Sequence, residues 1–293
     1  MWPAASRLAP FPMPVSLSPC IGLACLLLTF TFSSSASELR LEGKLVQGGL
    51  VTGHAAPGVQ VTFDGRKVRV SEDGVFLIGF GRDAKPQSIL EIEFQDGRKT
   101  TQRLEVAKRD YKIQRIDGLP QRKVTPKPDD LKRIRQEAAL VKAARRRDDP
   151  RTDFRRGFIW PAVGRVSGVY GSQRILNGEP RRPHFGVDVV APVGTPVVAP
   201  ADGVVTLVHP DMFFSGGTLV IDHGHGLSSS FLHLSEVLVE VGQRVKQGEL
   251  VARIGATGRV TGAHLDWRMN LFDARIDPQL LVGEMPESSA AIH

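Results

Sequence analysis

The stretch Pro183-His-Phe-Gly-Val-Asp188 holds two side chains that could bind one divalent metal. His184 offers an imidazole nitrogen and Asp188 a carboxylate oxygen, and both are ordinary zinc ligands. Four residues of extended chain span roughly 13 Å, whereas two ligands of one zinc ion each lie about 2 Å from it. We therefore expect the chain to bend between them at Gly186, whose missing side chain permits the bend.

Further ligand-type side chains follow in the second half of the chain, where seven of the eight histidines lie at or after His184. His264 and Asp266 are separated by one residue, which puts them on one face of a strand about 7 Å apart. One of them can then ligate a metal while the other reaches a water on it. His233 lies in another strand-like run, Ser230-Phe-Leu-His-Leu-Ser235.

The elements that must position these residues are short strands. From about Phe158 the chain has apolar runs at 218–221 and 250–254, separated by frequent glycines. Two segments, at 193–198 and 241–246, share the pattern Val-Gly-x-x-Val. Short strands joined by glycine turns predict an antiparallel sheet curled on itself, over residues 158–283. The polar tail, residues 284–293, is expected to be loose.

The region before it is also predicted to be β-rich. Between residues 37 and 119, alternating apolar runs are punctuated by the dipeptides at 64–65, 73–74 and 96–97, which are all Asp-Gly. Asp-Gly between alternating runs indicates a hairpin, and six or seven short strands suggest a small β-sandwich. No cluster of catalytic groups occurs there, so we expect an accessory binding or spacing domain.

Residues 120–157 connect the two regions. Residues 121–128 carry prolines and lysines typical of a linker, and 129–147 have acids in the first turn and arginines in the last, which predicts a helix. Its narrow apolar stripe consists of Leu131, Ile134, Ala138 and Val141. The helix is either a basic surface that touches anionic wall or a partner, or a connector with solvated charges, and the second interpretation is favoured.

The first 36 residues are expected to be a secretory signal peptide. An apolar run of about a dozen residues, 21–32, is preceded by Arg7 and followed by the small residues Ser34-Ser-Ala36. An uncleaved anchor is the alternative, but the run is short for a membrane span. A lipid-modified Cys20 or Cys25 is disfavoured, because neither follows a complete apolar segment. Cleavage after Ala36 leaves an exported chain without cysteine, disulfide or stable membrane insertion, placed in the periplasm or cell envelope.

The charge suggests what the exported chain meets. The formal net charge is +7, and cleavage removes one arginine and no acid, which leaves 7 − 1 = +6. A basic exported protein is drawn to polyanions, such as anionic cell-wall polymer or lipid surface. No signature of RNA or DNA binding accompanies the charge, so a nucleic-acid partner is not expected.

Six segments together resemble the lysostaphin/LytM-type zinc endopeptidases that act on peptidoglycan. The resemblance covers roughly residues 158–281, in matching order and spacing, and is carried by the segments at 183–188, 195–203, 222–224, 231–235, 241–248 and 261–266. It implies that His184 and Asp188 are zinc ligands and that His233 and His264 are catalytic. The third ligand of that family is the second histidine of a His-x-His motif, and Asp266 occupies its place here.

Asp266 therefore departs from the family pattern, and three interpretations are open. It is a true ligand of an active variant site, or it marks a non-catalytic descendant that only binds, or it is structural in a site that recruits no metal. As a ligand it lowers the formal charge of the site from +1 to 0, so a bound water is acidified less, and manganese gains relative to zinc. Restoring histidine at 266 is then expected to raise the activity of a catalytic site.

The resulting expectation is an exported zinc endopeptidase that hydrolyses peptide cross-links of peptidoglycan, with Zn²⁺ as cofactor and wall-remodelling or cell-division proteins among its partners. The alternative is a non-catalytic module that binds peptidoglycan or activates a separate cell-wall amidase. A carrier domain that holds biotin or lipoate shares the glycine-rich strands, but no lysine lies in a convincing hairpin. Arg174 and Asn177 either contact substrate or lie in a solvent loop, and His223 and His225 are expected to be structural.

Overall fold

The computed structural model describes residues 39–287. The predicted signal peptide and the last residues of the predicted tail lie outside this range. Within it, no helix is both long enough and apolar enough to span a membrane. The described chain is mostly β-strand, so the predicted mainly β architecture is confirmed.

The first region consists of two antiparallel sheets with one shared core. One sheet has the order β1 (Arg40–Gly43), β2 (Leu50–His54), β5 (Val75–Gly79), and the other β4 (Arg66–Val68), β3 (Gln60–Phe63), β6 (Gln87–Glu93), β7 (Lys99–Glu105). Phe76 and Ile78 from one sheet pack with Leu90 and Ile92 from the other in one buried cluster. The Asp-Gly turn at 64–65 has positive φ at both residues, 46° and 76°, as a tight hairpin turn requires.

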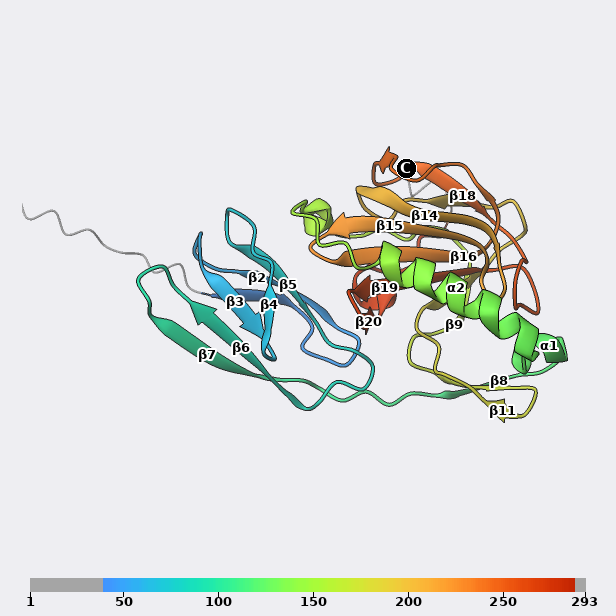
Figure 1. Cartoon of the computed structure of the whole chain (residues 1–293), viewed down its shortest axis with the longest axis horizontal. Coiled ribbons are helices and arrows are strands. Elements are labelled where there is room, and N and C mark those ends of the chain that lie inside the picture. Colours follow the sequence, from blue (N-terminus) through green and yellow to red (C-terminus); the bar gives the residue numbers. More distant parts are fainter. Residues whose placement is uncertain (1–38, 288–293) are drawn as a thin grey trace, which may run out of the picture. The chain divides into compact units, whose positions relative to one another are not determined.

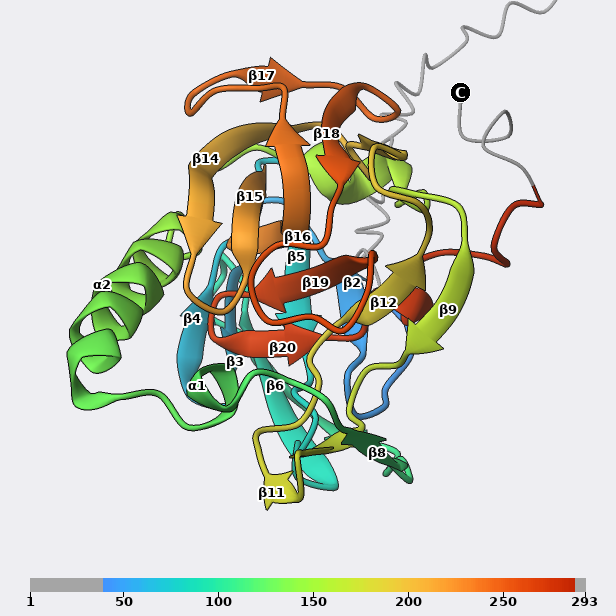
Figure 2. The same ribbon diagram turned by 90° about the vertical axis from the view of Figure 1, so that its right-hand side faces the viewer.

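Helix α2 (Pro128–Ala144) follows the short α1 (Gln121–Val124) and lies beside strands β14 and β15 of the second region (Figure 2). Of the apolar stripe noted in the sequence, Leu131 and Ala138 are exposed, and Ile134 and Val141 are half-buried. The helix packs Val141 and Ala144 against an apolar cluster of the sheet. It also uses polar anchors, because the buried Glu137 accepts a hydrogen bond of 2.8 Å from the N–H of Phe213.

The second region is built on a ten-stranded sheet whose pairings are all antiparallel (Figure 1). Its main path runs β17-β14-β15-β16-β19-β12-β9, while β13 and β20 pair with β18 and β19 at the side. Trp267, Phe231 and Val187 are fully buried in its core. The bounds are β9 (Arg165–Gly168), β12 (Val187–Val190), β13 (Pro196–Val198), β14 (Gly203–Met212), β15 (Gly216–Gly224), β16 (Leu227–Val237), β17 (Arg244–Val245), β18 (Leu250–Ile254), β19 (Leu265–Leu271) and β20 (Ala274–Ile276); the 3₁₀ turns are η1 (Asp153–Arg156) and η2 (Pro278–Leu280).

A strand from the connecting segment joins the second region. β8 (Ile113–Ile116) pairs in parallel with β10 (Gln173–Leu176), which forms a hairpin with β11 (Glu179–Pro180). Asn177, with φ 47° in the hairpin turn, accepts from the N–H of Leu119 at 3.1 Å and donates to its carbonyl at 2.7 Å. Residues 113–119 are therefore fixed against the hairpin that precedes His184, although the sequence grouped them with the accessory domain.

Candidate metal centre and active site

Strand pairing brings the three predicted metal ligands together. Asp188 on β12 lies directly opposite Asp266 on β19, so their side chains share one face of the sheet. His184 precedes β12, and the chain bends at Gly186 as the sequence predicts. One donor atom from each of the three side chains lies within 4.8 Å of the other two, and all three residues are buried.

The donor atoms of His184 and Asp188 have the spacing of two ligands of one cation. His184 Nε2 lies 3.0 Å from Asp188 Oδ1, but the geometry is not that of a hydrogen bond, and both atoms are buried without a hydrogen-bond partner. Two donors that each lie about 2 Å from one tetrahedral ion stand roughly 3.3 Å apart. Buried polar atoms are almost always satisfied, so this orphaned pair fits a metal ion.

Two glycines leave the space that the carboxylates occupy. A Cβ at Gly186 would lie 2.5 Å from Asp266 Oδ1, and one at Gly168 would lie 2.1 Å from Asp188 Oδ2. Gly186 does not have positive φ. Its importance therefore comes from the close approach of β19 as well as from the bend that the sequence analysis attributed to it.

Two arginines form hydrogen bonds with the carboxylates. The sequence analysis missed Arg268 and left the role of Arg174 open. Arg268 donates to both oxygens of Asp266, at 2.9 Å from Nε to Oδ1 and 2.5 Å from Nη2 to Oδ2. Arg174 donates to Asp188 Oδ2 at 2.8 Å. The alternation Asp266-Trp-Arg268 places both side chains on one strand face and is the signal that could have revealed the first pair.

The arginines decide the ionisation and the charge of the site. Burial raises the pKa of Asp266, but Arg268 and His184 together lower it by more, so that the pKa lies well below its usual value. Burial also raises the pKa of Asp188, whereas His184 and Arg174 bring it below its usual value. Both carboxylates are therefore ionised at neutral pH. With a divalent ion, the two carboxylates and the two paired guanidinium groups, the formal sum is +2 − 2 + 2 = +2, so the arginines offset the charge of the second carboxylate.

The two predicted catalytic histidines face each other beside this group. The rings of His233 and His264 have centroids 4.9 Å apart. His233 Nδ1 lies 2.9 Å from the carbonyl of Thr257, and His264 Nδ1 lies 2.9 Å from that of Gly262. A carbonyl only accepts, so each Nδ1 carries the proton when the ring is neutral and each Nε2 keeps a free lone pair.

Burial and backbone geometry set the state of these histidines. Burial lowers the pKa of His233 to about 4, and the nearby His264 lowers it as well, although Asp266 opposes the shift. His233 has φ 67°, in the left-handed region, at an irregularity in the pairing of β16. Non-glycine residues in this region are uncommon and cluster at functional sites. His264 Nε2 lies 4.0 Å from Asp188 Oδ1, which links the two histidines to the ligand group.

A cavity of about 380 Å³ opens onto these residues. Asp188, His233 and His264 contribute to its wall, and Gln114 and Ile116 line it from β8 of the connecting segment.

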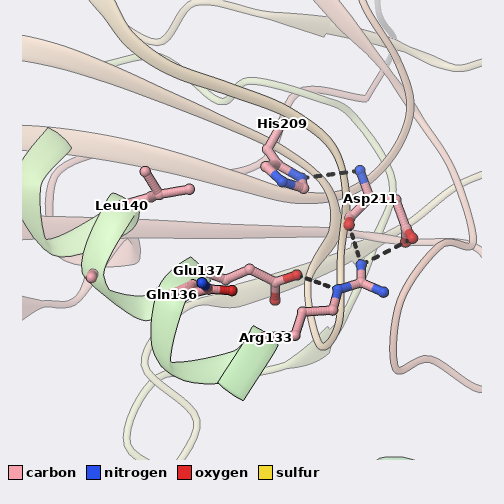
Figure 3. Close-up of a pocket in the computed structure, with 7 residues that line it drawn as sticks. Arg133, Gln136, Glu137, Leu140, His209 and Asp211 are labelled. Carbon is pink, nitrogen blue, oxygen red and sulfur yellow. Dashed lines mark hydrogen bonds and ion pairs between the residues drawn. The ribbon is translucent and has the colours of Figure 1, made fainter. Parts of the chain in front are cut away.

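A larger hollow of about 810 Å³ lies between α2 and the end of β14. Figure 3 shows that its charged groups satisfy one another: Arg133 pairs with Glu137 and Asp211, which leaves no free ligand set there.

The remaining sequence candidates do not join the site. His223 is buried, with Nδ1 2.7 Å from the carbonyl of Asp202 and Nε2 2.7 Å from Ser229 Oγ, and burial lowers its pKa to about 4. His225 is buried with its ring 5.3 Å from that of Phe154. Asn177 is used by the backbone of the connecting segment, so only Arg174 of the predicted loop pair reaches the cavity.

Comparison with known proteins places this geometry in context. Residues 182–278 match the sequence profile described as Peptidase family M23. A crystal structure from Pseudomonas aeruginosa, classed as a peptidase M23, superposes with a TM-score of 0.63 at 34% identity, over 81% of this chain and 94% of that one. The sequence-based resemblance is thereby confirmed, and with it the fold of the second region.

Two curated relatives come from Vibrio cholerae. The peptidoglycan DD-endopeptidase ShyA is 41% identical over 104 residues, which are 32% of this chain and 24% of the relative. The peptidoglycan DD-endopeptidase ShyC is 37% identical over 128 residues, which are 43% of this chain and 29% of the relative. The match thus spans less than a third of the length of either relative.

Proposed function

Because the chain belongs to peptidase family M23, we propose that it is an exported, zinc-dependent endopeptidase that hydrolyses peptide cross-links of peptidoglycan. The observation that carries the proposal is the buried group of His184, Asp188 and Asp266 beside the facing histidines His233 and His264. The similarity to two peptidoglycan DD-endopeptidases supports the substrate class.

The donor set fits zinc. The unpartnered atoms His184 Nε2 and Asp188 Oδ1 supply one nitrogen and one oxygen, and a carboxylate oxygen of Asp266 supplies the third donor. Each carboxylate oxygen has two lone pairs, so the hydrogen bonds from Arg268 leave acceptor capacity on Asp266. When bound, the ion would supply Lewis-acid polarisation of the scissile carbonyl and would acidify a water.

The protein's own residues then account for proton movement. The backbone carbonyls of Thr257 and Gly262 hold His233 and His264 in the tautomer whose Nε2 is free. In this role one Nε2 accepts a proton from the attacking water, and a protonated Nε2 returns it to the leaving amine. The imidazole that is protonated at a given moment also stabilises negative charge on the carbonyl oxygen.

The enzymatic proposal is tested with two variants of the chain from residue 37 onward. His184→Ala should lose both zinc and the release of peptides from sacculi, because a ligand is removed. His233→Ala should retain zinc but lower the release rate by about a hundredfold or more, as expected for a lost general acid or base. Wild-type release from both variants would show that the site is assigned wrongly.

A second candidate function is a groove that binds peptidoglycan without turnover, alone or as activator of an amidase. The specific observation in its favour is that the guanidinium groups of Arg174 and Arg268 already neutralise both carboxylates, which an ion-free site would need. Zinc content and peptide release measured on the same sample separate the two, since the binding module releases no peptide whether or not it holds zinc.

A further inference from the structure

The cavity beside the two histidines has a strongly basic wall. Its charged lining consists of one carboxylate, Asp188, and three guanidinium groups, Arg165, Arg174 and Arg259. Arg174 is engaged by Asp188. No acidic side chain among residues 39–287 lies within ion-pair distance of Arg165 or Arg259, so two positive charges face the cavity without an anionic partner.

Arg259 is held in place without being neutralised. Its guanidinium lies 4.5 Å above the ring of Phe214, and its Nη1 donates to the carbonyl of Lys123 at 3.2 Å. Both contacts are to uncharged groups, and they fix the plane of the guanidinium while most of its five N–H donors stay free. Burial lowers the pKa of Arg259 to about 10, and nearby Arg174 and Arg268 lower it as well, as expected for a cation that lacks a close acid.

Arg165 contributes a second unpaired guanidinium to the lining of the cavity from another element. Arg165 lies on β9, the last strand on the main path of the sheet. Its partner in the strand pairing is Val190, which also lines the cavity. Arg165 is exposed, so its side chain is free to turn toward a ligand. A cavity of about 380 Å³ lies in the size range of pockets that enclose small ligands or peptide side groups.

We propose that Arg259 and Arg165 form a carboxylate-binding subsite, which selects peptides that carry a free carboxylate near the scissile bond. This rests on the proposed function, because His233 and His264 line the same cavity and locate the bond to be cut. Arginine matches a carboxylate with two parallel N–H donors, and such charge-assisted bonds are stronger than neutral ones. The subsite therefore contributes to the choice of substrate and leaves the proton transfer to the histidines.

The test measures binding of stem peptides that have no cross-link and so cannot be turned over. One probe keeps its carboxylates free, and the other has all of them converted to carboxamides. The chain from residue 37 onward should bind the carboxylate form about tenfold or more tightly than the carboxamide form. Arg259→Gln and Arg165→Gln should each bring this ratio down toward one.

The matched control is Arg253→Gln, which removes an arginine that pairs with Glu236 and does not line the cavity. It should keep the wild-type ratio, which separates a subsite from the general effect of positive charge. Thermal unfolding shows whether Arg259→Gln still folds. If it does not, Arg165→Gln still tests the subsite, because the Arg165 side chain is exposed and makes no hydrogen bond or ion pair within residues 39–287.

Equal binding of both probes by the wild-type chain, or an unchanged ratio in both cavity variants, would overturn the subsite. The release of peptides from sacculi is measured in parallel. Release with no preference for the carboxylate overturns the subsite alone. A preference without release leaves the subsite standing and overturns the proposed hydrolysis.

Discussion

Arg268 and Asp266 lie two residues apart on β19, and the guanidinium of Arg268 donates to both carboxylate oxygens of Asp266. Asp266 is fully buried, and the Arg268 side chain keeps 24% of its exposure. The pair presents a carboxylate toward His184 and Asp188 while its net charge is zero, like that of a neutral histidine. The sequence alone suggested that aspartate lowers the charge of the site, and this inference changes once its partner is counted.

The pair predicts that Asp266→His will lower the stability of the protein. The sequence alone led to the expectation that this change would raise its activity. Histidine would leave the guanidinium of Arg268 largely buried without its partner, at a cost of about 3–5 kcal/mol in the free energy of unfolding. The double variant Asp266→His with Arg268→Gln should be clearly more stable than the sum of the single effects. Urea unfolding of the three variants measures this, and an Asp266→His protein as stable as wild type would contradict the prediction.

Gly186→Ala should disturb the metal site through space alone. The new Cβ would lie 2.5 Å from Asp266 Oδ1 and 2.6 Å from the carbonyl oxygen of Trp267, so β12 and β19 would have to separate. We expect a loss of about 1–3 kcal/mol of stability together with weaker zinc binding, measured by unfolding and by metal titration. Gly81→Ala is the control, because its Cβ meets nothing within 4 Å, and it should change neither quantity appreciably.

Asn177→Gly should loosen the connecting segment from the hairpin next to His184. Glycine accepts the φ of 47° found there but removes both hydrogen bonds to the backbone of Leu119. The expected cost is about 1–2 kcal/mol, with faster cleavage of residues 117–127 in limited proteolysis. Asn177→Asp keeps the acceptor for the Leu119 N–H and should show a smaller effect. Unchanged proteolysis in both variants would mean that other contacts hold β8.

His223 should make stability depend on pH. Burial lowers its pKa to about 4, whereas an unfolded histidine has a pKa near 6.5. Between these values the unfolded state binds more protons, so the contribution of His223 to stability is lost as pH falls from about 6.5 toward 4, by roughly 3 kcal/mol in full. Asp222 acts in the opposite direction, because burial raises its pKa to about 6 and its protonated form favours the folded state.

The contribution of His223 is therefore read from a difference. Urea unfolding of wild type and His223→Gln at several pH values between 7 and 4 should show a shallower acid loss in the variant, since glutamine does not titrate. The charged groups around the ring, namely Asp153, Arg151 and Asp202, are the same in both proteins. Parallel stability profiles would contradict the assignment.

The parts of this fold that the sequence predicts are local. Asp-Gly dipeptides specify the tight turns of the first region, and the glycine bend between His184 and Asp188 follows from the reach of the chain. The motif order predicts the family and the second region. Each of these depends on a few neighbouring residues.

The features that the sequence did not predict depend on distant pairings. Arg174 reaches Asp188 only because of the fold of the hairpin that β8 borders, and the parallel pairing of β8 with β10 joins segments about sixty residues apart. The sequence did not predict how α2 packs, because the helix buries Glu137, a polar residue that anchors it to the N–H of Phe213. Periodicity counts apolar residues and so overlooks such anchors.

The central claim is that His184, Asp188 and Asp266 hold a zinc ion that supports hydrolysis. The most direct measurement determines zinc by elemental analysis and peptide release from sacculi on the same sample of the chain from residue 37 onward. The account predicts one zinc per chain and a release that stops when zinc is chelated and returns when it is restored. A chain with one zinc bound and no release, or release that persists without metal, would contradict it.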